Sequence, residues 1–126
     1  METPDDRKYS KEHEWLKIEN LKGIIGITDH AQNSLTDIVF IELPEEGKKL
    51  EIQKPFCVIE SVKSVSDVFS PVNGEIIEVN KGLEDHPELI NQSPYQEGWI
   101  VKVKISEEDK DLMTAKEYDD FIAKEH

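Results

Sequence analysis

The stretch Glu60-Ser61-Val62-Lys63-Ser64-Val65-Ser66-Asp67 places one lysine between two similar Ser-Val pairs in the most apolar part of the sequence. β-branched residues predominate from Pro55 to Phe69, which predicts β-strand on both sides of Lys63. A cation in the middle of a buried strand would lose its hydration without a partner. We therefore expect Lys63 at the exposed tip of a β-hairpin, with arms over residues 56–62 and 64–69.

The whole chain has the composition of one small acidic domain. Its 126 residues include 28 acidic and 15 basic side chains, which give a formal net charge of −13. A phosphate backbone would be repelled by such a surface, so nucleic acid is not expected as a partner. No apolar run approaches membrane-spanning length, so no membrane partner is expected. The N-terminal residues are acidic and unlike a signal peptide, which predicts a cytoplasmic location.

Alternating and β-branched segments predict further strands on both sides of the hairpin. They fall at Trp15–Glu19, Gly23–Ile27, Ile38–Leu43, Gly74–Val79 and Trp99–Ile105. Thr28 is expected to cap a short helix over Asp29–Ser34, and Asp85 to begin another.

Both ends of the chain have a different character from the predicted strands. Residues 1–8 are polar and expected to be loose. Residues 107–126 are predicted to form a C-terminal helical segment. Ser106 and Thr114 each begin a capping-box pattern, and apolar residues recur after them at helical spacing.

The pattern P-x-x-G-x-x-[LI]-E occurs twice, over Pro44–Glu51 and Pro71–Glu78. Two copies of a strand-turn-strand unit predict a sandwich or flattened barrel with approximate two-fold symmetry. The expected fold is therefore mainly β: a barrel-sandwich hybrid of two quasi-symmetric antiparallel sheets with short helices. We expect a single domain covering residues 1–126.

A lysine at a hairpin tip has three roles open to it. It can be an ordinary solvated charge, a Schiff-base amine, or a site that another enzyme modifies. A Schiff-base amine needs a lowered pKa, whereas the nearest charged neighbours, Glu60 and Asp67, are acids. The small side chains beside Lys63 leave room for an approaching enzyme and suit the third role.

Cysteine and histidine offer little further chemistry. Cys57 is the only cysteine, so no internal disulfide can form, and we expect it to be a small buried hydrophobe. The four histidines, His13, His30, His86 and His126, are scattered without metal-ligand spacing, so no metal site is expected.

From Lys8 to Tyr118 the chain resembles the H-protein family of the glycine cleavage system, whose members are lipoyl carriers. The matching segments keep the family's order: Glu12-His13-Glu14-Trp15, Gly26–Gln32, Asp37–Phe40, Glu42-Leu43-Pro44, Glu60–Lys63, Ser70–Gly74, Asn80, Leu89–Asn91, Ser93–Tyr95 and Glu97–Trp99. The resemblance implies a fold like that of lipoyl and biotinyl domains. It also implies that Lys63 carries lipoate as an amide.

The same resemblance implies a carrier rather than an enzyme. Its expected partners are a pyridoxal-phosphate glycine decarboxylase, a folate-dependent aminomethyltransferase, a dihydrolipoyl dehydrogenase and a lipoate ligase or lipoyltransferase. We expect a monomer, because an arm that visits several enzymes must stay unobstructed. The amine of the aminomethyl cargo is cationic, so acids lining a groove would hold it. Glu14 and Asp67 are the candidates for this contact, and His30 is a candidate for lining the same groove.

Departures from the family pattern leave alternatives open. Thr36 stands where the family commonly has glycine, and it would be strained there if the position needs a positive φ. Ser64-Val65-Ser66 replaces a commoner alanine-rich run, and Cys57 replaces a smaller residue. One alternative is an H-like lipoyl carrier that serves another pathway, such as sulfur oxidation. A biotin carrier is disfavoured because Lys63 lacks flanking methionines, and an unmodified scaffold is the remaining alternative.

Overall fold

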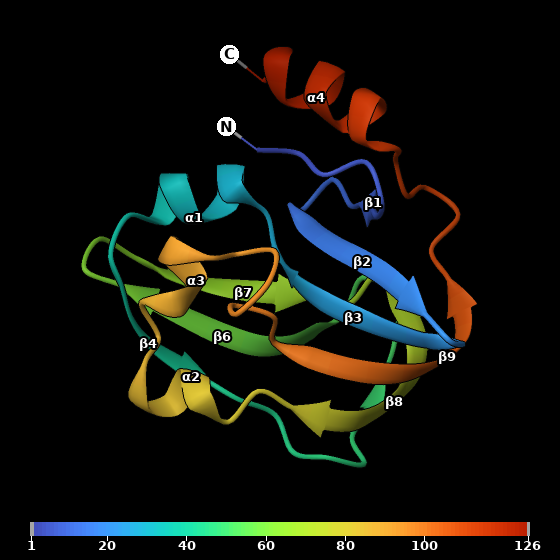
Figure 1. Cartoon of the computed structure of the whole chain (residues 1–126), viewed down its shortest axis with the longest axis horizontal. Coiled ribbons are helices and arrows are strands. Elements are labelled where there is room, and N and C mark those ends of the chain that lie inside the picture. The colour runs from blue at the N-terminus through green and yellow to red at the C-terminus, as the bar shows by residue number, and fades with distance from the viewer. Residues whose placement is uncertain (1, 126) are drawn as a thin grey trace.

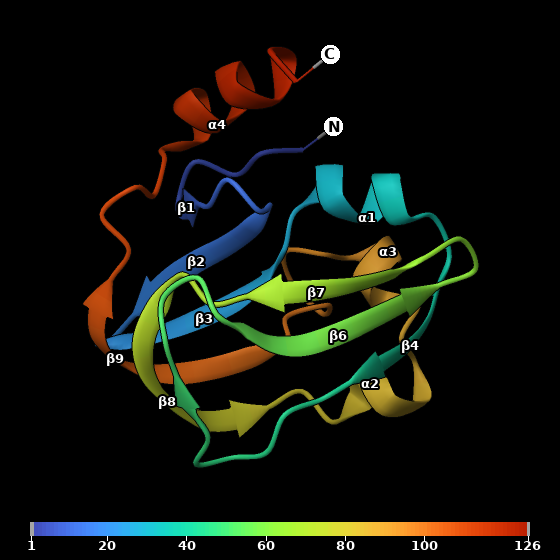
Figure 2. The same ribbon diagram turned by 180° about the vertical axis from the view of Figure 1, so that it is seen from behind.

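Two antiparallel sheets of unequal size form the framework of the chain in the computed structural model, which describes residues 2–125 (Figure 1). The larger sheet contains, in spatial order, β1 (Lys8–Tyr9), β2 (Glu14–Glu19), β3 (Lys22–Ile27), β9 (Val101–Glu108), β8 (Val72–Val79) and β5 (Lys49–Leu50). The smaller sheet contains β4 (Ile38–Glu42), β6 (Pro55–Ser61) and β7 (Val65–Phe69), seen from behind in Figure 2. The prediction of a mainly β fold with two antiparallel sheets is confirmed, and both sheets are open.

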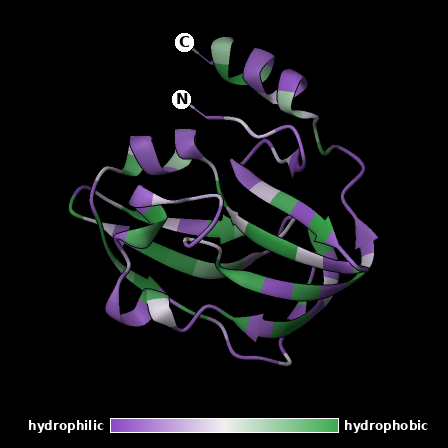
Figure 3. Cartoon of the chain, viewed as in Figure 1, coloured by the Kyte–Doolittle hydropathy of each residue, from purple (hydrophilic) through white to green (hydrophobic). Residues whose placement is uncertain are grey.

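Apolar side chains from the facing sides of the two sheets form the main core. It includes Leu16, Ile25, Ile41, Phe56, Ile59, Val68, Val72, Ile76, Val101 and Val103. The central strand β6 is hydrophobic along most of its length (Figure 3). Cys57 lies in this core as expected, and burial raises the pKa of its thiol to about 12. The thiol is therefore protonated at neutral pH and a poor nucleophile.

The two copies of the repeated sequence pattern lie against each other. Leu50 of the first copy is opposite Gly74 of the second, in the pairing of β5 with β8. Gly47 of the first copy donates its N–H to the carbonyl of Ile76 at 2.8 Å. The glycine of each copy thus lies beside the apolar end of the other, as approximate two-fold symmetry predicts. A Cβ on Gly74 would lie 2.3 Å from the carbonyl oxygen of Lys104, so the close approach of β9 requires glycine there.

Four helices flank the sheets within the described residues 2–125: α1 (Asp29–Leu35), α2 (Gly82–Asp85), α3 (Leu89–Gln92) and α4 (Ala115–Ala123). The predicted caps of α1 and α4 are confirmed. Thr28 accepts a hydrogen bond from the N–H of Ala31, and Thr114 forms a capping box with Glu117. No helix within residues 2–125 is long and apolar enough to cross a membrane.

Two helix predictions are wrong. Asp85 ends α2 instead of beginning a helix, because the N–H of His86 closes that turn on the carbonyl of Gly82. The capping-box pattern at Ser106 lies inside β9, where Glu107 and Glu108 pair with β8. Strand pairing thus satisfies the backbone that the predicted helix start would have used, and the C-terminal helix spans only Ala115–Ala123.

The N-terminal segment, predicted to be loose, is held by contacts over residues 2–8. The N–H of Glu2 donates to Asp29 at 2.9 Å, and the hydroxyl of Thr3 donates to Asp119 at 2.6 Å. The guanidinium of Arg7 lies over the Trp15 ring, 4.6 Å from its centroid. A second apolar cluster of Tyr9, Trp15, Tyr95 and Tyr118 lies here and joins α4 to the larger sheet. The N-terminal segment, β1 and α4 are consequently found together at one end of the molecule (Figure 1).

Candidate functional site

Lys63 lies in the turn between β6 and β7, and the predicted hairpin is confirmed. The turn extends beyond the body of the two sheets (Figure 2). Val62 and Val65 beside it are 69% and 64% exposed, and Lys63 is exposed as well. Lys63 takes part in none of the ion pairs formed within residues 2–125. Its amine is thus accessible to a modifying enzyme.

The hydroxyl of Ser61 fixes the backbone beneath Lys63. Ser61 Oγ accepts hydrogen bonds from the N–H of Lys63 at 3.1 Å and from the N–H of Ser64 at 3.0 Å. The N–H of Val62 donates to the carbonyl of Asp37 at 3.0 Å, which ties the turn to the segment before β4. The backbone that carries the Lys63 side chain is therefore held in place on both sides of the turn. Sequence reasoning noted Ser61 only as a small neighbour, although serine commonly forms such turns.

Exposed apolar side chains surround the base of the turn. Phe40 on β4, Glu60 on β6 and Val65 on β7 are cross-strand neighbours in one row. Phe40 is 49% exposed, and Val39 next to it is 54% exposed. Exposed apolar groups of this kind are characteristic of interaction surfaces. The surface around Lys63 therefore suits a partner that engages the turn from outside.

Glu14 is buried at the start of β2 and connects the two sheets. Its Oε1 accepts a hydrogen bond from the hydroxyl of Ser10 at 2.5 Å, and its Oε2 accepts one from the N–H of Phe69 at 3.1 Å. Burial raises the pKa of this carboxyl to about 7, and the hydrogen bonds from Ser10 and Phe69 oppose the increase. Near neutral pH the group is thus poised between its neutral and charged forms.

Asp67 lies on the same strand as the Phe69 N–H that Glu14 contacts. It is exposed on β7, two residues before Phe69, which corresponds to about 7 Å along the strand. β7 is an edge strand of the smaller sheet and leads directly away from Lys63. The structure therefore places both candidate acids beside β7, the strand that leads away from the turn of Lys63.

His30 belongs to a different group of side chains. Its ring centroid is 4.7 Å from that of His13, and its Nε2 is 4.0 Å from Glu125 Oε2. The structure thus places His30 on α1 against the C-terminal segment. Within residues 2–125, the one carboxylate that pairs with this imidazole is that of Glu125.

Thr36 has φ 65° and ψ −147°, a conformation that glycine adopts far more easily than threonine. The position where the family commonly has glycine therefore does need a positive φ. Asn91 bridges this strained corner, because its side-chain amide donates to Thr36 O at 2.7 Å and its Oδ1 accepts from the N–H of Ile38 at 2.9 Å. The corner carries the chain from α1 into β4, beside the turn of Lys63.

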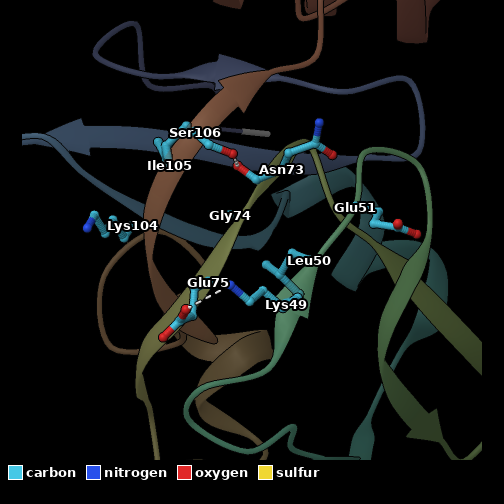
Figure 4. Close-up of a pocket in the computed structure, with 9 residues that line it drawn as sticks. All are labelled: Lys49, Leu50, Glu51, Asn73, Gly74, Glu75, Lys104, Ile105 and Ser106. Atoms are coloured by element: carbon cyan, nitrogen blue, oxygen red, sulfur yellow. Dashed lines mark hydrogen bonds and ion pairs between the residues drawn. The ribbon is translucent and has the colours of Figure 1, made fainter.

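A surface pocket lies in the larger sheet, away from the hairpin. It is lined by residues of β5, β8 and β9 and by Glu51 (Figure 4). Its charged groups partly neutralise one another, since Lys49 Nζ is 3.3 Å from Glu75 Oε1. No residue of the β6–β7 hairpin lines it. The candidate site is thus a projecting side chain and not this pocket.

Comparison with known proteins supports the resemblance over almost the whole chain. The family model described as "Glycine cleavage H-protein" matches residues 7–125. The chain belongs to the glycine cleavage H-protein family. A relative from Bacillus licheniformis, named "Glycine cleavage system H protein", is 51% identical over 124 residues, covering 97% of this chain and 98% of its own. A relative of the same name from Rubrobacter xylanophilus is 52% identical over 117 residues, covering 93% and 92%.

A solved structure gives the same result for the fold. The crystal structure of a glycine cleavage system H protein from Mycobacterium marinum superposes with a TM-score of 0.91 at 36% sequence identity. The match covers 95% of this chain and 98% of that one. Members of the family are lipoyl carrier subunits and not catalysts, so this chain is a carrier. These relatives do not favour the alternative of a carrier for sulfur oxidation.

Proposed function

We propose that Lys63 carries lipoate in amide linkage, in the lipoyl carrier of the glycine cleavage system. The observation that carries this proposal is the free, exposed amine of Lys63 on a turn fixed by Ser61. The residues fit the group, because within residues 2–125 Lys63 is exposed and forms no ion pair, so acylation removes an unpaired charge. Bound lipoate supplies a dithiolane that accepts electrons together with an aminomethyl group.

The proposed partners are those implied by the family. They are a pyridoxal-phosphate glycine decarboxylase, a folate-dependent aminomethyltransferase, a dihydrolipoyl dehydrogenase and a lipoate ligase or lipoyltransferase. The exposed apolar residues around the turn, including Phe40 and Val65, offer each of them a small contact surface. The net charge of −13 favours partners with basic docking faces and contacts that weaken with salt. We place the carrier in the cytoplasm as a monomer.

Glu14 and Asp67 are proposed to hold the cationic amine of the cargo. Asp67 is exposed, and Glu14 lies deeper, against the edge of the same strand. A cation beside Glu14 would lower its pKa from about 7 and favour the carboxylate, which then makes a charge-assisted hydrogen bond. We do not include His30 in this contact, because its ring faces Glu125.

Intact-mass measurement of protein made in a lipoate-supplied host tests the proposal. We expect a mass gain of one lipoyl group in the wild-type chain and in Lys110→Arg, an exposed control lysine. We expect no gain in Lys63→Arg, and no glycine decarboxylation when this variant is combined with the partner enzymes. A wild-type chain without the gain, or a gain that persists in Lys63→Arg, would overturn the assignment.

A further inference from the structure

Three potential metal ligands from distant parts of the sequence converge near the C-terminus. His13 lies in the turn between β1 and β2, His30 lies on α1, and Glu125 follows α4. His13 Nε2 is 3.1 Å from Glu125 Oε1, and His30 Nε2 is 4.0 Å from Glu125 Oε2. One ligand atom from each residue lies within 4.8 Å of the other two. The scattered spacing of the histidines in the sequence gave no sign of this arrangement.

A chain of hydrogen bonds orients the His13 ring. His13 Nδ1 is 2.7 Å from the hydroxyl of Tyr118, which is 2.8 Å from Thr28 Oγ1. Thr28 Oγ1 also accepts a hydrogen bond from the N–H of Ala31, so it is fixed at the start of α1. Metal-binding histidines characteristically donate their second ring N–H to a partner of this kind. The network leaves His13 Nε2 as the nitrogen that faces Glu125.

The backbone of His13 is held in an uncommon conformation. Its φ is 72°, in the left-handed region. Its N–H donates to Ser10 O at 3.1 Å, and its carbonyl accepts from the N–H of Thr28 at 3.0 Å. Strained backbone that the surrounding structure enforces is common at functional sites. Here it brings the imidazole of His13 beside that of His30.

Electrostatics favour a bound cation between these groups. Two imidazoles and one carboxylate face a common point, and only 20% of the His13 side chain and 18% of the His30 side chain are exposed. A neutral imidazole is the form that binds metal, and a carboxylate next to two imidazoles supplies the negative charge that attracts a cation.

We propose that His13, His30 and Glu125 bind one divalent transition-metal ion, with Zn²⁺ as the best match. Zn–N and Zn–O bonds of about 2.0–2.2 Å place neighbouring ligand atoms roughly 3.3 Å apart, so small side-chain movements complete the site. Two nitrogen ligands favour Zn²⁺ over Mg²⁺ or Ca²⁺, which prefer oxygen. The ion would join the β1–β2 turn, α1 and the end of α4, with a fourth position left to water.

The proposed ion stabilises the carrier and takes no part in transfer of the cargo. Tyr118, which orients His13, also stacks on Tyr9 with ring centroids 4.8 Å apart. Binding at His13 therefore reinforces the contact between α4 and the second apolar cluster. We expect Zn²⁺ to raise the midpoint of thermal unfolding of the whole chain, since an ion bound only by the folded state stabilises it.

The test uses the full-length, untagged chain with Lys63→Arg, so that no dihydrolipoyl thiol can bind the metal. After removal of metal by a chelator, calorimetry with Zn²⁺ is expected to show a single specific site. Co²⁺ is expected to give the visible absorption of a tetrahedral nitrogen and oxygen site. His30→Gln and Glu125→Gln are each expected to weaken Zn²⁺ binding at least tenfold and to abolish the Co²⁺ signal.

A control histidine variant, a third ligand variant and a folding check keep the result interpretable. His86→Gln changes an exposed histidine that pairs with Glu88 at 3.2 Å, and it should leave Zn²⁺ affinity unchanged. His13→Asn keeps a residue that tolerates positive φ and should also lose binding. Unchanged metal-free circular dichroism in His30→Gln and Glu125→Gln would show that these variants fold. Zn²⁺ affinity equal in the parent chain and in these folded variants, or no stoichiometric binding by the parent, would overturn the proposal and leave an ordinary His–Glu ion pair.

Discussion

The N–H of Phe69 donates to Glu14 Oε2 at 3.1 Å. A buried acid on β2 of the larger sheet thus contacts β7, the edge strand of the smaller sheet that follows the turn of Lys63. This contact joins the two sheets near the proposed path of the cargo. It also keeps a titratable group inside the protein, where its charge state responds to what lies beside it.

Glu14 should lower the free energy of unfolding as pH rises. A salt-bridged acid, whose pKa is lowered by folding, has the opposite effect. Its pKa is about 7 in the folded chain, against an ordinary value of 4.5. The folded state therefore binds more protons between these values, and stability falls as pH rises from about 4.5 through 7, by roughly 3 kcal/mol. Below pH 4.5 this contribution is fully present. Glu14→Gln should remove the slope and be the more stable form at pH 8.

Urea unfolding of the wild type and Glu14→Gln in metal-free buffer, across pH 4 to 8, measures this effect. The difference between the two proteins isolates Glu14 from the many exposed acids. A constant difference across that range would show that Glu14 has an ordinary pKa.

Loss of either candidate acid should expose the cargo to water. Glu14→Gln and Asp67→Asn each remove a charge that can hold the cationic amine, so the loaded carrier should release formaldehyde at least about tenfold faster in Glu14→Gln and several-fold faster in Asp67→Asn. One lost charge-assisted hydrogen bond corresponds to about 1.5–3 kcal/mol, and partial solvent exposure reduces the effect for Asp67. Glu51→Gln, an exposed acid outside the hairpin, serves as the control. Release at the wild-type rate in both variants would remove these residues from the site.

Thr36→Gly should stabilise the chain. Glycine adopts the φ of 65° and ψ of −147° without the steric cost that threonine bears, a gain of about 1 kcal/mol. Thr36→Ala is the matched control, because it removes the hydroxyl but keeps the Cβ, and it should give no such gain. Denaturant midpoints at one pH measure both. Equal midpoints for glycine and alanine would place the strain elsewhere.

Ser61→Ala should loosen the turn without removing the modification. The N–H groups of Lys63 and Ser64 lose their acceptor and turn to water, at a cost of about 1 kcal/mol. We expect lower backbone order parameters for residues 62–64 and slower lipoylation by the ligase, with full mass gain at long times. Ser66→Ala on β7 should change neither. Wild-type order parameters in Ser61→Ala would mean that strand pairing alone fixes the turn.

Most of the fold could be predicted because its helix caps and hairpin depend on residues that are close together in the sequence. The helix start at Thr28 and the capping box at Thr114 depend on side chains within one turn, and both are confirmed. The β-branched arms around Lys63 likewise define their own hairpin. The helix start predicted at Ser106 was wrong because that segment pairs with β8, which lies more than thirty residues earlier in the sequence.

The remaining features depend on contacts that no local pattern encodes. Glu14 directly precedes the core residue Trp15 in β2, yet it is buried as well, because β7 closes over it. His13, His30 and Glu125 meet only after α4 has folded back onto the β1–β2 turn. A sequence read in order shows three ordinary polar residues there.

The burial of Cys57 has a consequence for electron flow. Cys57 is the only cysteine of the chain, and its thiol is both shielded by the core and protonated at neutral pH. Thiol–disulfide exchange needs an accessible thiolate, so Cys57 cannot reduce the dithiolane of the proposed lipoyl arm. Reducing equivalents on the proposed arm at Lys63 would therefore remain there until a second protein accepts them.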